Sequence, residues 1–565
     1  MKCLGLQLTV LLICSAAAWS QQAPPSPVRI AVDYTAKQGV FEPVWAYFGY
    51  DECNYTYMKY GKKLLGELSR LGPAPVYLRC HNLLTSGDGT PSLKWGSTNA
   101  YREDESGRPI YEWTILDRIF DAYRETGTRP LVEIGFMPEA LSIKPQPYRH
   151  DWPKTFSTGW AYPPSDYKKW ADFIHAWVKH CVDRYGKAEV ESWLWELWNE
   201  PDIGYWKGTP EEYHKLYDFT ADAVKRALPT AKIGGPHTTN PGDGRSGAFL
   251  RGFLEHCARG TNHATGKTGA PLDYIAFHAK GATRLADGRP QMNLAPQLKA
   301  ISKGFEIVAS FPEWKKTPMI IGESDPEGSA ASAARLHPQN SYRNGSQYAA
   351  YTAATIRHTL DLAREKQVNF QGAVTWAFEF EDQPYFEGFR TLATNGIDKP
   401  VLNLFRMLGL MSGDRLATRS DPSRNTDSLI AQAVRTEPYI DALATGADAQ
   451  ISVLIFNYHD DTLSGQEAAV ELAFANLPPS ASRVLVHHYR VDNQHSNAHT
   501  VWQQMGSPQR PTEEQHARLQ AAGQLQMLSS PQWFAVDGGR LTFSFILPPQ
   551  GVSLVQLTWH TASAK

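Results

Sequence analysis

The chain alternates between short apolar runs and longer segments in which apolar residues return every three or four positions. Short apolar runs bounded by turn residues are typical of buried strands, whereas the longer spacing is typical of amphipathic helices. The pattern predicts eight strands in the first part of the chain. These strands are Val44–Phe48, Val76–Cys80, Pro130–Gly135, Trp193–Asn199, Lys232–Gly235, Tyr274–His278, Pro318–Glu323 and Gln371–Phe378.

Helical segments lie between most of these strands. The predicted helices are Tyr57–Leu71, Trp113–Glu125, Tyr167–Tyr185, Glu211–Leu228, Pro296–Ser310 and Tyr348–Glu365. A repeated strand-then-helix order indicates a parallel sheet covered by helices, and eight repeats can close into a barrel. We therefore predict an α/β fold in which residues 41–413 form a (β/α)8 TIM barrel.

The pattern changes beyond Asp414, where short strands are separated by Gly, Pro, Asn and Ser turns. This pattern of strands and turns predicts an accessory antiparallel β-sandwich domain over residues 414–565. One helix, Pro511–Ala522, interrupts it, with Thr512 as the predicted N-cap. The predicted strands are Gln450–Tyr458, Glu467–Phe474, Arg483–Val491 and Leu541–Leu547.

The first twenty residues have the pattern of a secretory signal peptide. A basic start at Lys2 is followed by an apolar stretch from Leu4 to Ala18 and a small-x-small cleavage site at Ala18-Trp19-Ser20. We predict that residues 1–20 are removed, that a linker begins at residue 21, and that the mature protein is periplasmic or secreted. No other segment is apolar and long enough to span a bilayer.

Four cysteines remain after the signal peptide, namely Cys53, Cys80, Cys181 and Cys257. Their spacing does not match a metal site, and they could form up to two disulfides of undetermined pairing. Because they are scattered singly among apolar segments, buried thiols are favoured.

Composition and charge narrow the function classes. Hydrophobic residues make up 42% and charged residues 20%, as in soluble globular proteins, and a net charge of −2 gives no reason to expect a nucleic-acid or membrane partner. The 17 tryptophans suit a carbohydrate cleft, although large cores also use them. His487, His488, His495 and His499 have irregular spacing and no acidic ligands, so no metal or cofactor is predicted. The sequence does not indicate the oligomeric state.

Candidate chemistry lies at the carboxyl ends of the predicted strands, where TIM barrels place their active sites. Glu200 follows the fourth strand and Glu323 ends the seventh, across the barrel mouth. A retaining glycosidase needs two carboxyls about 5–5.5 Å apart, one as nucleophile and one as acid and then base. The tryptophan-rich run Trp193–Trp198 would bury Glu200 and raise its pKa, as a general acid requires.

Each candidate also has a purely structural interpretation. An isolated Asn-Glu-Pro after a strand can be a simple turn, but a second strand-end glutamate favours catalysis. His81 and His278 could be core histidines or sugar contacts, and Trp376 could be barrel packing or a stacking platform. Lys280 and Arg390 could be partners in structural ion pairs or could contact the ligand.

Five motifs along the chain carry a family resemblance. They are WELWNEPD (Trp195–Asp202), PLVEIGFMPE (Pro130–Glu139), LRCHNLL (Leu78–Leu84), LDYIAFHAKGA (Leu272–Ala282) and VWQQMGSPQRPTEEQ (Val501–Gln515). These motifs resemble those of glycoside hydrolase family 39, which contains β-xylosidases and α-L-iduronidases. The resemblance implies Glu200 as acid/base, Glu323 as nucleophile and Asn199 at the sugar 2-hydroxyl. It also implies that Val28–Tyr34, within residues 21–40, supplies the first strand of the accessory sandwich.

The same resemblance leaves two sugars in competition. Many family xylosidases carry threonine before the nucleophile, whereas Gly322 precedes Glu323 here, as in iduronidases. Iduronidases would hold their sugar with the residues that match His278, Lys280, Asp382 and Arg390, with the lysine and arginine on the uronate carboxylate. Against a uronate, four nearby acids could pair with those cations and repel an anionic substrate. These acids are Glu327, Glu379, Glu381 and Asp382.

The whole chain, including AFEFEDQPYF (Ala377–Phe386), is most similar to secreted bacterial β-xylosidases. We therefore predict a retaining exo-glycosidase that removes β-D-xylose from the non-reducing ends of xylo-oligosaccharides. An iduronide or arabinoside substrate is the first alternative. A carbohydrate-binding barrel without turnover is the second, and the presence of both glutamates argues against it.

Overall fold

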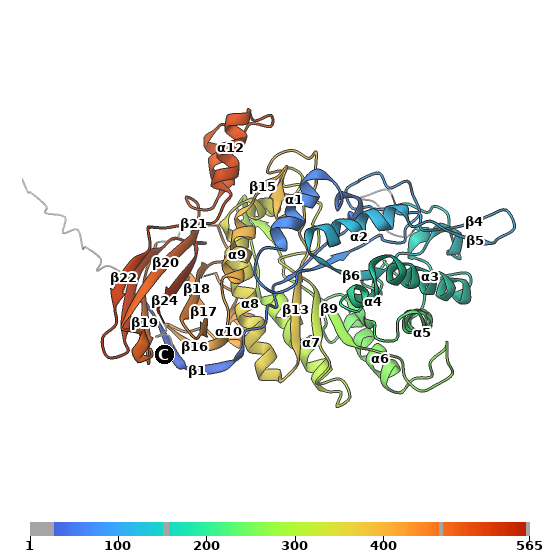
Figure 1. The fold of residues 1–565 in the computed structure, drawn as a ribbon, viewed down its shortest axis with the longest axis horizontal. Helices are drawn as coiled ribbons and strands as arrows, with labels where there is room; N and C mark the ends of the chain where they lie inside the picture. Colours follow the sequence, from blue (N-terminus) through green and yellow to red (C-terminus); the bar gives the residue numbers. More distant parts are fainter. Residues whose placement is uncertain (1–26, 151–157, 436, 463–466, 561–565) are drawn as a thin grey trace, which may run out of the picture.

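The computed structural model describes residues 27–150, 158–435, 437–462 and 467–560, and it contains a barrel beside a curled sheet (Figure 1). The predicted signal peptide lies outside the described residues, so export stays a prediction. Within the described ranges, no helix combines the length and the apolar character that crossing a membrane requires.

The barrel consists of eight parallel strands that are hydrogen-bonded in chain order, which confirms the predicted fold class. The strands are short and almost wholly buried, because helices cover them outside and side chains fill them inside. They are β2 (Tyr47–Tyr50), β3 (Tyr77–Cys80), β6 (Arg129–Ile134), β7 (Leu194–Leu197), β8 (Lys232–Thr238), β9 (Tyr274–Lys280), β12 (Met319–Asp325) and β13 (Phe370–Thr375).

An outer ring of helices packs its apolar faces on these strands. The predicted helix Tyr167–Tyr185 is confirmed to the residue, and the others agree to within a few positions. The helices α6 and α9 were not among those predicted. The main helices are α1 (Lys59–Leu68), α2 (Thr114–Thr126), α3 (Tyr167–Tyr185), α5 (Pro210–Ala227), α6 (Arg245–Arg259), α7 (Ala295–Ala309), α8 (Ser346–Lys366) and α9 (Pro400–Gly409).

The accessory region is one ten-stranded sheet that curls on itself. The strand β1 lies between β16, its antiparallel partner, and β19, its parallel partner, so the sheet is mixed rather than wholly antiparallel. The expected N-terminal strand is therefore confirmed, and it continues to Val40. The strands are β1 (Val28–Val40), β16 (Asp414–Asp421), β17 (Tyr439–Ala447), β18 (Gln450–Tyr458), β19 (Ala468–Ala475), β20 (Arg483–Val491), β21 (Gln526–Met527), β22 (Gln532–Ala535), β23 (Leu541–Leu547) and β24 (Val552–Thr558).

The helix α12 (Glu513–Ala522) projects from the accessory region (Figure 1). Thr512 and Gln515 form a reciprocal capping box at its start, which confirms the predicted N-cap. The domain limits at residues 40 and 413 stay predictions.

The sheet is fixed to the barrel because its central strands are buried on both faces. Leu454 and Phe456 of β18 belong to the barrel core, whereas Val453 and Ile455 point into a second core inside the sheet. The helix α8 lies between barrel and sheet and is buried nearly all round. The four cysteines at positions 53, 80, 181 and 257 are free and buried, as favoured by the sequence.

Candidate active site

Glu200 and Glu323 meet at the carboxyl end of the barrel. Glu200 follows β7, and Glu323 lies near the carboxyl end of β12. An oxygen of one carboxyl lies within 4.8 Å of an oxygen of the other. Retaining glycosidases hold their two carboxyls about 5–5.5 Å apart, whereas inverting enzymes need about 6.5–9.5 Å to fit a water. The observed separation therefore fits the retaining geometry.

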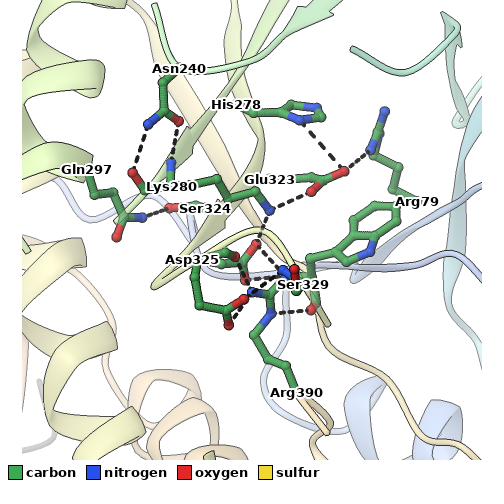
Figure 2. A network of polar contacts seen from close by, with 12 residues as sticks. Arg79, Asn240, His278, Lys280, Gln297, Glu323, Ser324, Asp325, Ser329 and Arg390 are labelled. Atoms are coloured by element: carbon green, nitrogen blue, oxygen red, sulfur yellow. Dashed lines mark hydrogen bonds and ion pairs between the residues drawn. The ribbon is translucent and has the colours of Figure 1, made fainter. Parts of the chain in front are cut away.

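Glu323 is surrounded by cations (Figure 2). Its Oε1 accepts a hydrogen bond of 3.1 Å from Nη1 of Arg79, and its Oε2 accepts one from Nζ of Lys280. Burial by itself would raise the pKa of Glu323, but Lys280 and then Arg79 hold it well below its usual range. Glu323 is therefore a buried carboxylate that stays ionised.

Glu200 has the opposite electrostatic environment. Its Oε1 lies 3.0 Å from Nδ1 of His278, and its side chain is 15% exposed. Burial, followed by the negative charge of Glu323, raises the pKa of Glu200 to about 7. One carboxyl thus keeps its proton up to near-neutral pH while its neighbour is ionised, which is the pattern that separates an acid from a nucleophile.

The backbone turns sharply to present Glu200. Trp198 and Glu200 both have left-handed φ angles, 67° and 43°, and such angles are uncommon in residues other than glycine. The predicted strand Trp193–Asn199 therefore ends earlier, at Leu197. The backbone N–H of Glu200 donates to the carbonyl of His237 on β8, which fixes the turn.

Arg79 lies at the centre of the site and joins three carboxyls. It contacts Glu133 at 2.8 Å, Glu196 at 2.5 Å and Glu323 at 3.1 Å, with no exposed side-chain surface. Its Nη2 also donates to Oδ1 of Asn199, at 3.2 Å. Asn199 is therefore held beside Arg79 at the end of β7.

Lys280 and Arg390 are paired with acids from the end of β12 and the loop after it (Figure 2). Lys280 contacts Asp325 at 2.7 Å in addition to Glu323. Arg390 is fully buried, at 0% exposure, and contacts Glu327 at 2.8 Å and Asp325 at 3.5 Å. Both cations expected to meet a uronate thus already have carboxylate partners.

The remaining predicted site residues, His81, Trp376 and Asp382, differ in how far they are buried. His81 contacts Asp51 at 2.6 Å, and its ring centre is 4.3 Å from that of Trp376. Trp376 is only 2% exposed, so most of its ring is used in packing. Asp382 is exposed on the loop after β13, and within the described residues it forms no hydrogen bond or ion pair. Every predicted site residue except Asp382 is therefore joined to the others by a polar or ring contact.

Residues 29–539 match the family model described as glycosyl hydrolases family 39. The chain belongs to this family. This match covers the barrel strands and most of the accessory sheet.

Relatives of this family 39 chain include both expected activities. A β-xylosidase of Geobacillus stearothermophilus is 28% identical over 496 residues, which cover 85% of this chain and 86% of the relative. An α-L-iduronidase of Mus musculus is 28% identical over 419 residues, covering 69% and 62% respectively. A solved bacterial orthologue of human α-L-iduronidase has a TM-score of 0.75 at 21% identity over 95% of this chain and 84% of that chain, which supports the fold alone.

The family 39 site contains residues that the sequence analysis did not select. Arg79, Glu133, Glu196 and His237 are buried charged or polar groups inside the barrel. For Arg79, Glu133 and Glu196 the signal was a single charged residue within a predicted apolar strand, which is costly to bury unless it is paired. His237 lies beyond the predicted strand Lys232–Gly235 and had no such signal. Glu133 and Glu196 are also register partners on adjacent strands.

Glu200, His278 and Glu323 are ligand types that metal ions accept, and their atoms lie within 4.8 Å of one another. However, Arg79 and Lys280 already donate to both oxygens of Glu323. A metal cation would be repelled by these charges, so the arrangement suits carboxylate chemistry better.

Proposed function

We propose that this family 39 glycoside hydrolase is a retaining exo-β-D-xylosidase. The observation that carries the proposal is the pair of carboxyls within 4.8 Å, of which Glu323 is held ionised while the pKa of Glu200 is raised to about 7. Glu323 would attack the anomeric carbon while Glu200 protonates the leaving oxygen, giving a covalent glycosyl-enzyme. Glu200 would then remove a proton from the water that hydrolyses this intermediate.

The charges explain how Glu200 could change from acid to base. In the free enzyme, the negative charge of Glu323 is one cause of the raised pKa of Glu200. Bond formation between Glu323 and the sugar removes that charge. The pKa of Glu200 then falls, and the carboxyl is left as the base that the second step needs.

The preference for a neutral sugar follows from the paired cations. Lys280 is shared by Glu323 and Asp325, and Arg390 is held by Glu327. A uronate would have to displace these carboxylates from buried sites, at a cost in desolvation. The β-xylosidase relative with 86% of its length covered supports the same choice. The iduronidase relative keeps a uronide as the alternative.

A panel of nitrophenyl glycosides tests the choice of sugar. We expect kcat/KM for the β-D-xyloside to exceed that for a matched α-L-iduronide or β-D-glucuronide by at least ~100-fold, which corresponds to ~2.7 kcal/mol. Proton NMR of early turnover should show β-xylose before mutarotation, because two displacements retain the configuration. A preference for a uronide would reject the xylosidase assignment, and α-xylose as first product would reject retention.

Lys280→Met tests what the lysine does for the nucleophile. Lys280 is the strongest of the groups that lower the pKa of Glu323, so its loss should raise that pKa. The nucleophile must be ionised, so the acidic limb of kcat/KM for the xyloside should move upward by at least about one pH unit. Lys303→Met, which removes a lysine paired with Asp243 outside the site, serves as the control. An acidic limb unchanged by Lys280→Met would show that the lysine does not hold Glu323 ionised.

A further inference from the structure

A second histidine stands behind His278 and links it to a buried carboxylate. Nε2 of His278 lies 3.4 Å from Nδ1 of His237, and Nε2 of His237 contacts the carboxylate of Glu196. Glu196 in turn accepts a hydrogen bond of 2.5 Å from Arg79. The contacts therefore form one continuous chain from Arg79 to Glu200.

The order of donors and acceptors along this chain is determined at its Glu196 end. Although burial opposes it, Arg79 and then His237 lower the pKa of Glu196, so Glu196 is ionised and can only accept. Nε2 of His237 must then carry a hydrogen. Burial lowers the pKa of His237 to about 4 and that of His278 to about 3, so both rings are neutral.

A neutral imidazole has one donor and one acceptor. A lone pair on Nε2 of His237 would be repelled by the carboxylate of Glu196 that it contacts, so this nitrogen carries the hydrogen and Nδ1 accepts. Nε2 of His278 must then supply the hydrogen between the two rings. Nδ1 of His278 is then an acceptor, and it lies 3.0 Å from Oε1 of Glu200. Only a protonated Glu200 can complete this hydrogen bond.

The backbone conformation of His237 and the space left by Gly322 both fix the position of the His237 ring. His237 is fully buried with a left-handed φ of 56°, a strained conformation that persists only where its surroundings enforce it. A Cβ on Gly322 would lie 2.1 Å from Nδ1 of His237 and 3.1 Å from Cδ2 of His278. The missing side chain before Glu323 therefore makes room for the two rings.

We propose that His237 is a positioning residue that fixes the tautomer of His278 and so keeps the acid proton on Glu200. Gly322 has no side chain and so leaves the space that the two rings need. This inference rests on the proposed acid role of Glu200. Without it, His278 could carry its hydrogen on Nδ1 and stabilise ionised Glu200 or Glu323. The charged and titratable groups that face the two rings are Glu196, Glu200, Glu323, Arg79, Lys280 and His81.

His237→Leu and Gly322→Ala test the proposal by kinetics. Both should lower the pKa of the alkaline limb of kcat/KM by about one unit, because ionised Glu200 gains a donor. In His237→Asn the pKa of the alkaline limb should return part of the way to its wild-type value. Asparagine tolerates the left-handed φ, and its side-chain oxygen can accept the hydrogen from His278. His214→Leu, which removes a histidine of lowered pKa on α5, is the control and should leave the limb in place.

Nitrogen-15 NMR of histidine-labelled protein tests the tautomer without turnover, with His278→Gln to assign the signals. We expect wild-type His278 to carry its hydrogen on Nε2 and His237→Leu to lose that preference. A hydrogen on Nδ1 of wild-type His278 would overturn the proposal. If wild type shows the alkaline limb but His237→Leu leaves its pKa unchanged, the positioning role of His237 is wrong and the acid role of Glu200 still stands. If Glu200→Gln retains the limb, the proposed function fails.

Discussion

Replacing Glu323 by alanine is expected to reduce kcat/KM for the xyloside by at least ~10⁴-fold, because the group that attacks the anomeric carbon is lost. Azide or formate should restore part of the activity by entering the space that the carboxylate leaves. The anion attacks once from the nucleophile's side, so the product should have the α configuration, which NMR can identify.

Glu381→Ala is the matched control for this variant. Glu381 is a nearby carboxylate that accepts a hydrogen bond from the backbone of Tyr60, and it does not contact the two glutamates. Activity should stay close to wild type. Near-normal turnover by folded Glu323→Ala, as judged by circular dichroism, would show that the nucleophile lies elsewhere.

Replacing Glu200 by glutamine is expected to slow hydrolysis of substrates with poor leaving groups by about 10²–10⁴-fold. Dinitrophenyl xyloside should be spared in the glycosylation step, because its leaving group departs without a proton. Pre-steady-state measurement of that step separates it from hydrolysis of the intermediate. Equal losses on good and poor leaving groups would contradict the acid role.

The same variant should change the pH profile. The acid must be protonated, and the pKa of Glu200 is raised to about 7, so wild-type kcat/KM should fall as the pH rises through that value. Glu200→Gln cannot lose this proton and should flatten the alkaline limb. The acidic limb depends on Glu323, whose pKa is far below its usual range, and should remain.

The barrel could be predicted from the sequence because its determinants are local. Each buried parallel strand is an apolar run, and each covering helix shows its own periodicity, as in Tyr167–Tyr185. The strand limits were less accurate where the backbone departs from regular geometry. The left-handed angles at Trp198 and Glu200 end β7 early, and no local sequence pattern indicates them.

The two glutamates could be predicted because their role depends only on strand order and position at a strand end. Arg79 and His237 could not be predicted as site residues, because their roles depend on partners that are distant in the chain. Arg79 meets Glu323 across 244 positions, and His237 meets Glu196 on the neighbouring strand. For the same reason, the partners of Lys280 and Arg390 became clear only once β9, β12 and the loop after β13 were brought together.

The position of β1 limits how the protein can be divided. This first strand fills the gap between β16 and β19, in the interior of a sheet whose other strands come from the end of the chain. A recombinant fragment that begins at residue 414 would lack it and would expose two unpaired strand edges, which promote aggregation. During synthesis, the sheet likewise cannot be completed until the barrel has been made. Expression of the accessory region by itself would therefore require residues 28–40 to be joined to it.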